Sequence, residues 1–416
     1  MVTLLASCAV DPGLADGAQG PLLIVARGAP PPVVADVRAA AVDAPMAAAG
    51  LRLCQYDDGA AQVEGVDAVP ASGCTAPNSS APGRDFMTGG LAHQAVQDIS
   101  ASFLGGYVFG NACGLGGGQD ERLMVYFPEV AVLTFFLSQD TRFPQLRQPA
   151  WVLGSRMFFS GLDGSARFNR PLVVDEAVPL TSDLTEVNIS NSTVQVSGSR
   201  PFIAFMSENQ GYFGAESYNK LQEARRNKHP EQRLAGDEEY SFEKQVRAWY
   251  GAVTLTSYAT EMRPVLKELV GSIGTGPWLA GLWWGDSQVG MLASWIGQAL
   301  AAPSWGGVFP LDYYLYADFT ENPGNQCFVH SASNCRACLD ACKSRPLPDS
   351  AYWMPNYAMV AGQACAAQSS SDCGQYGIED VFKAYNESTA HDLWSDAEAA
   401  MRRGSTDKTV FDLLLR

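Results

Sequence analysis

The chain has 416 residues, of which 47% are hydrophobic and 17% are charged, a balance that is sufficient to build a globular core. Its formal net charge of −16 excludes broad electrostatic binding to a phosphate backbone, because such binding needs a surface rich in lysine and arginine. We therefore expect no direct DNA binding. No apolar run approaches the roughly 20 residues of a membrane-spanning helix, so we expect no membrane span.

Residues 1–85 are rich in Ala, Gly and Pro, which predicts an N-terminal extension of short elements and loops. Within this extension we expect an alanine-rich helix over residues 33–49 and a short strand over 51–56. Denser apolar periodicity predicts one main domain over residues 86–416. A polar segment rich in Cys, Ser and Pro, at about 321–371, is interpreted as an insertion on the surface of this domain.

Helical and strand patterns alternate along the main domain. Helices are predicted over 128–137, 238–250, 261–270 and 287–300, the last because its apolar residues recur with the 3.6-residue helical period. Short strands are predicted over 150–153, 173–174, 202–205 and 311–316. This alternation predicts an α/β domain with a parallel or mixed sheet.

The first candidate site is a glycine-rich segment, residues 103–118, which is followed directly by Gln119, Asp120 and Glu121. Glycine lets successive backbone N–H groups converge on an anion, and a polar triplet after such a loop is placed to face the same ligand. A flexible loop with solvated charges would show the same glycines. Both interpretations stay open at this point.

The second candidate site is the segment 275–286, which leads into the helix predicted from residue 287. A loop that opens onto a helix N-terminus can bind an anion, because free N–H groups and the helix dipole point the same way. Trp283 and Trp284 would either cover a nucleoside or fill the core, and core tryptophans are the commoner case.

Together the two segments resemble the poly(ADP-ribose) glycohydrolases. Residues 98–106, the triplet 119–121 and the segment Tyr126-Phe127-Pro128-Glu129 are similar to the first signature of this family. Thr275-Gly276-x-Trp278, Gly281 and Gly285-Asp286 are similar to its second signature and follow in the same order. The resemblance covers about residues 89–318 and the last eight residues, 409–416.

The resemblance implies a macrodomain-like three-layer domain with a central mixed sheet flanked by helices, carrying the N-terminal extension and the Cys-rich insertion. It implies a glycosidase that hydrolyses the ribose–ribose O-glycosidic bonds of poly(ADP-ribose), free or on an ADP-ribosylated protein, and releases ADP-ribose without a cofactor or a metal. Glu121 falls on the catalytic general acid/base, and Asp120 on the neighbour that holds the ribose hydroxyls. Adjacent carboxylates cannot straddle one bond, so Glu121 would perform both proton transfers.

The resemblance also assigns residues that bind the substrate. They belong to the triplet, the glycine loop, the diphosphate loop and the adenine side, and they are Gln119, Gly105, Gly106, Gly281, Trp283, Gly285, Asp286, Asp98 and Ile99.

Several positions depart from the family pattern. Tyr107 replaces the third glycine, Pro277 replaces the loop asparagine, and Asp120 is one methylene shorter than the family's glutamate. The segment 156–161 lacks the family's active-site tyrosine. The alternative function is therefore a non-catalytic ADP-ribose-binding module.

The chain has ten cysteines, and six of them fall late, at Cys327, Cys335, Cys338, Cys342, Cys365 and Cys373. Zinc bound with His330 and disulfides both fit this clustering, and disulfides are favoured because the Cys-x-x-Cys pair is not repeated. With four N-glycosylation sequons, the cysteines slightly favour an extracytoplasmic compartment over the nucleus or cytoplasm. An extracellular interaction protein stapled by disulfides is a third possibility.

Overall fold

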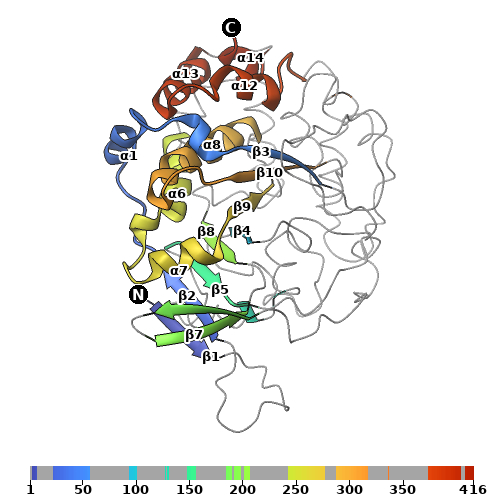
Figure 1. The fold of residues 1–416 in the computed structure, drawn as a ribbon. Helices are drawn as coiled ribbons and strands as arrows, with labels where there is room; N and C mark the ends of the chain where they lie inside the picture. The colour runs from blue at the N-terminus through green and yellow to red at the C-terminus, as the bar shows by residue number, and fades with distance from the viewer. Residues whose placement is uncertain are drawn as a thin grey trace, which may run out of the picture.

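The structure is a computed structural model, and it describes residues 2–6, 22–56, 93–100, 127, 129–130, 148–155, 184–189, 192–197, 201–206, 242–276, 287–316, 336, 373–403 and 408–416. Within these residues the fold is mixed α/β, with a sheet flanked by helices (Figure 1).

The main sheet has eight described strands in the order β1-β2-β5-β8-β4-β9-β10-β3. Their bounds are β1 (Val2–Ala6), β2 (Leu22–Arg27), β3 (Arg52–Tyr56), β4 (Gln94–Ser100), β5 (Ala150–Leu153), β8 (Phe202–Met206), β9 (Ser272–Thr275) and β10 (Leu311–Tyr316). From β8 to β3 all neighbouring strands are parallel, whereas β5, β2 and β1 continue the sheet in antiparallel pairs. The carboxyl ends of β8, β4, β9, β10 and β3 therefore share one edge.

A separate antiparallel hairpin is formed by β6 (Leu184–Ile189) and β7 (Ser192–Ser197). It contacts β2 of the main sheet. The apolar side chains of Val187, Ile189 and Val196 belong to the same hydrophobic core as the sheet.

Helix α8 (Ser287–Trp305) is the central helix of the fold, and its residues 287–302 are all buried. A helix that is apolar on all sides must be surrounded by other elements of the protein on all sides. Helix α6 (Phe242–Val253) packs closely against it, because Gly297 leaves room for the Trp249 side chain, whose indole Nε1 donates to Gln298 Oε1 at 3.0 Å. The 3₁₀ helices η1 (Met46–Ala49) and η3 (Leu255–Ser257) also contact α8, and η3 leads into α7 (Met262–Leu269).

Three C-terminal helices complete the cover of α8. They are α12 (Ile378–Tyr385), α13 (Ala390–Arg403) and α14 (Val410–Leu414), and they gather at one end of the molecule (red in Figure 1). The rings of Trp295 in α8 and Phe382 in α12 stack with centroids 5.7 Å apart. The Thr409–Asp412 capping box starts α14, and the Asp412 carboxylate also accepts the Gln375 N–H at 2.6 Å.

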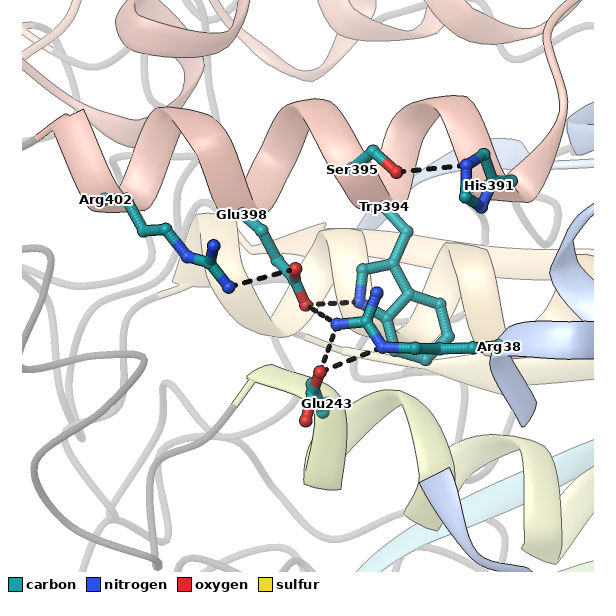
Figure 2. A network of polar contacts seen from close by, with 7 residues as sticks. All are labelled: Arg38, Glu243, His391, Trp394, Ser395, Glu398 and Arg402. Atoms are coloured by element: carbon teal, nitrogen blue, oxygen red, sulfur yellow. Dashed lines mark hydrogen bonds and ion pairs between the residues drawn. The ribbon is translucent and has the colours of Figure 1, made fainter. Parts of the chain in front are cut away.

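A polar cluster, Arg38, Glu243, Trp394 and Glu398, joins α1 (Val34–Ala41), α6 and α13 (Figure 2). The Arg38 guanidinium pairs with both carboxylates and lies 4.8 Å from the centroid of the Trp394 ring. The indole Nε1 of Trp394 donates to Glu398 at 2.7 Å. These contacts fix the helices from the two ends of the chain to each other.

Most predicted elements in the described part of the chain are confirmed. The strands predicted over 51–56, 150–153, 202–205 and 311–316 are β3, β5, β8 and β10, and the helices predicted over 238–250, 261–270 and 287–300 are α6, α7 and α8. Of the helix predicted over 128–137 only residues 129 and 130 are described, and they are helical. The strand predicted over 173–174 lies outside the described residues.

The prediction of one alanine-rich helix over 33–49 is wrong. The chain instead forms α1, leaves the helix after residue 41, and re-enters a short helical turn as η1. Pro45 explains the break, because proline disfavours the helical conformation of the residue before it, and Pro45 itself is extended, with ψ of 136°.

The segment 22–56 contributes β2, β3 and α1 to the same sheet and core as the later residues. The boundary predicted at residues 85 and 86 lies outside the described residues, and Arg336 alone represents the insertion at 321–371. Among the described helices, none combines the length and apolar character that crossing a membrane requires.

Candidate functional site

Two of the predicted site residues, Asp98 and Ile99, lie in the described part of the chain, among the last three residues of strand β4. The others lie outside it, and they are Glu121, Asp120, Gln119, Gly105, Gly106, Gly281, Trp283, Gly285 and Asp286. The described geometry of the candidate site is therefore the edge of the sheet from which these segments leave.

The strands that precede the two candidate segments are direct neighbours. Strand β4 ends at Ser100, before the glycine-rich segment, and β9 ends at Thr275, which is also the first residue of the second candidate segment, 275–286. The two strands pair in parallel, with Gln94 opposite Ser272 and Val96 opposite Gly274. Ligands of open α/β sheets bind outside the carboxyl ends of parallel strands, where neighbouring loops separate. The candidate segments thus start side by side at a favourable edge.

Asp98 is a buried carboxylate close to this edge. Its exposed fraction is 0%, and it lies opposite Ala204 of β8, on the other side of β4 from β9. A carboxylate at this depth is rare in a sheet core and needs polar or charged partners. Ile99 follows it and lies opposite Phe205 of β8.

A hydrogen-bonded bridge joins the middle of β4 to the last residue of β9. The Thr275 hydroxyl donates to Gln97 Oε1 at 2.9 Å, and Gln97 Nε2 donates to the backbone carbonyl of Asp98 at 2.6 Å. Thr275 and Gln97 are both completely buried. This bridge links the last residue of β9 to the backbone beside Asp98.

The opposite face of the sheet carries a second buried network, centred on Asp312 of β10. The Asp312 carboxylate pairs with Arg52 of β3 and accepts hydrogen bonds from Gln94 Nε2 and Ser272 Oγ, both at 2.6 Å. Gly274 makes this possible, because a Cβ there would lie 2.8 Å from Gln94 Cδ. The network ties the four strands β3, β10, β9 and β4 together.

Gln97 and the Asp312 network were not predicted from sequence. A usable signal exists in the segment 94–99, because a strand buried on both faces normally reads as a nearly continuous apolar run. Here three of the six residues, Gln94, Gln97 and Asp98, are polar. Polar residues at such positions indicate hydrogen bonds between strands or to a ligand.

No group of three or more His, Cys, Asp or Glu residues that could hold a metal ion occurs among the described residues. Of the six late cysteines only Cys373 is described, so the choice between disulfides and zinc stays a prediction.

No family model matches this chain, and no curated protein matches it. Support for the candidate site therefore comes from the chain's own residues and from the neighbouring carboxyl ends of β4 and β9.

Proposed function

We propose that this chain is a macrodomain-like glycosidase that hydrolyses the ribose–ribose O-glycosidic bonds of poly(ADP-ribose) and releases ADP-ribose. The observation that supports it is the parallel pairing of β4 with β9. The two segments that resemble the glycohydrolase signatures are about 155 residues apart in sequence, yet they follow neighbouring strands at the same sheet edge. A functional pair of loops requires this proximity.

In the proposed mechanism Glu121 enters the reaction protonated. It donates its proton to the departing ribose oxygen while positive charge develops at the sugar carbon, and it then accepts a proton from the attacking water. Asp120 holds the ribose hydroxyls. The backbone of Gly105 and Gly106 and the segment 281–286 surround the diphosphate, and glycine at these positions lets the backbone approach the phosphate oxygens.

The buried carboxylate of Asp98 supports the proposed adenine side of the site. A carboxylate accepts hydrogen bonds, and the exocyclic amine of adenine donates them. Asp98 lies two residues before the end of β4, so its strand leads directly into the glycine-rich segment. We propose that Asp98 binds the adenine amine and that Ile99 contacts the ring.

The experiment is hydrolysis of purified poly(ADP-ribose) by the wild-type chain and by Glu121→Gln, with ADP-ribose affinity measured by calorimetry. Glu268→Gln is the matched control, because Glu268 is exposed on α7, four residues before β9 begins, at the amino edge of the sheet. Loss of a general acid/base should reduce turnover by roughly 10²–10⁴-fold, with ADP-ribose affinity and the control unchanged. Equal turnover by Glu121→Gln and the wild type would exclude the assigned role of Glu121.

The second candidate function is a non-catalytic ADP-ribose-binding module. Asp120, Tyr107 and Pro277 favour it, because each departs from the family pattern at the proposed site. Binding without turnover in the wild type would select this module. The variant Asp120→Glu then tests whether the missing methylene group causes the absence of turnover, because a misplacement of about 1 Å is enough to lower the rate substantially.

The compartment and the cysteine chemistry are part of the same proposal. We propose an extracytoplasmic protein whose Cys-rich insertion is held by disulfides, acting on the free polymer or on ADP-ribosylated proteins. Peptide mapping without reduction would identify the cysteine pairs. Zinc released on denaturation, with every cysteine free to react with an alkylating reagent, would contradict the disulfides.

A further inference from the structure

We infer that Gln97 and Thr275 are positioning residues that couple the two loops of the candidate site. A structural change at the end of β9 then alters the local stability of the segment after β4. The two side chains are neither apolar core residues nor exposed. They form a hydrogen bond between adjacent strands at Thr275, which is the last residue of β9 and the first residue of the segment 275–286.

The chemistry of the bridge makes it sensitive to one hydroxyl group. Thr275 Oγ1 donates to Gln97 Oε1 at 2.9 Å, and Gln97 Nε2 donates to the Asp98 carbonyl at 2.6 Å. When the hydroxyl is removed, the fully buried amide oxygen of Gln97 loses this hydrogen bond, while Nε2 keeps its hydrogen bond to the Asp98 carbonyl. The side-chain link from the end of β9 to the backbone of β4 at Asp98 is then broken.

The bridge and the Asp312 network lie at different positions along β4 and β9. The Asp312 network uses Gln94 and Ser272, at the amino ends of β4 and β9, and it lies on the other face of the sheet. The Gln97–Thr275 bridge joins the middle of β4 to the carboxyl end of β9, so it lies closer to the edge from which the candidate loops leave. The first network therefore stabilises the sheet, whereas the bridge fixes the relative position of the loop starts.

Two variants of Thr275 test the bridge, and a third variant is the control. Thr275→Val keeps the branched shape that suits a strand and removes the hydroxyl, whereas Thr275→Ser keeps the hydroxyl. Thr254→Val is the matched control, because Thr254 is also buried and its hydroxyl is also hydrogen-bonded, to Thr256 at 3.0 Å, but it lies between α6 and η3.

The first readout is amide hydrogen exchange of the ligand-free protein. Thr275→Val should increase exchange in peptides from both 99–121 and 276–286, while Thr275→Ser and Thr254→Val should leave both close to wild type. Gln97→Met, made on the other strand, should increase exchange in 276–286 as well. An increase in Thr275→Val that is restricted to 276–286 would overturn the coupling.

The second readout is ADP-ribose affinity, and this part rests on the proposed function. Thr275→Val should weaken binding about tenfold, equivalent to ~1.4 kcal/mol, and should raise KM more than it lowers kcat, while Thr275→Ser should restore both. Unchanged affinity in Thr275→Val would refute a role of the bridge in binding. If the wild type does not bind ADP-ribose, the proposed function fails, and the exchange data still decide whether the bridge couples the loops.

Discussion

Replacing Asp312 by asparagine should destabilise the protein strongly. The Asp312 carboxylate is completely buried and accepts hydrogen bonds from Arg52, Gln94 and Ser272. Asparagine has nearly the same shape, but it offers one acceptor oxygen and places an N–H₂ group against donors. It also removes the negative charge that Arg52 faces. The substitution therefore tests the polar network without creating a cavity.

The expected loss follows from the burial of the two partners. Removing one member of a buried ion pair costs about 3–5 kcal/mol, because the remaining charge stays unpaired in a poorly solvated site. The Arg52 side chain is 25% exposed, so water recovers part of this energy. We expect Asp312→Asn to lower the free energy of unfolding by about 2–4 kcal/mol.

Urea denaturation followed by circular dichroism measures this loss. The midpoint should fall while the slope of the unfolding free energy against denaturant stays constant, which shows that stability alone has changed. Asp43→Asn is the control, because Asp43 is exposed after α1 and should change stability by less than about 0.5 kcal/mol. A loss below about 1 kcal/mol in Asp312→Asn would refute a substantial contribution of this network to stability.

Three further perturbations test the packing of the helices and the buried tyrosines. Glu398→Gln weakens the cluster of Figure 2 and should cost about 1–2 kcal/mol, measured by thermal unfolding. Gly297→Ala places a Cβ 2.8 Å from the side chain of Trp249, and overpacking of about 1–3 kcal/mol should exceed the helical preference for alanine; a stabilised variant would contradict this close approach. Burial raises the pKa of Tyr258 and Tyr313, so their contribution to stability is complete below the unfolded pKa of about 10 and is lost as pH rises above it. Tyrosine-to-phenylalanine variants at these two positions should therefore move alkaline unfolding, followed by fluorescence, to higher pH.

The local elements of this fold are largely predictable from sequence. Strand β10 has the predicted bounds, residues 311–316, because its aromatic and apolar residues leave little alternative to a buried strand. Helix α8 was also predicted from its periodicity, although it runs five residues further, to Trp305. Pro303 lies in this additional turn, and proline is normally a sign that a helix has ended.

The pairing of distant elements was not predictable from local patterns. Nothing in the composition of the N-terminal segment indicates that β3 lies next to β10, because register depends on the whole sheet rather than on either strand. The same holds for Gln97 and Thr275, whose hydrogen bond joins residues 178 positions apart. Of the candidate site, the sequence predicted the segments and their order, whereas the common edge follows from strand pairing.

The parallel pairing of β3 with β10 has a consequence for the synthesis of this protein. The partners Arg52 and Asp312 are 260 residues apart, and at a typical 5–20 residues per second the ribosome needs about 13–50 s to add the second after the first. Throughout this interval β3 is a short apolar and basic segment without its neighbouring strand, while β1 and β2 are close enough in sequence to pair early. The nascent chain thus depends on protection of β3 from other partners, and refolding from denaturant should be slow and should lose yield at high protein concentration.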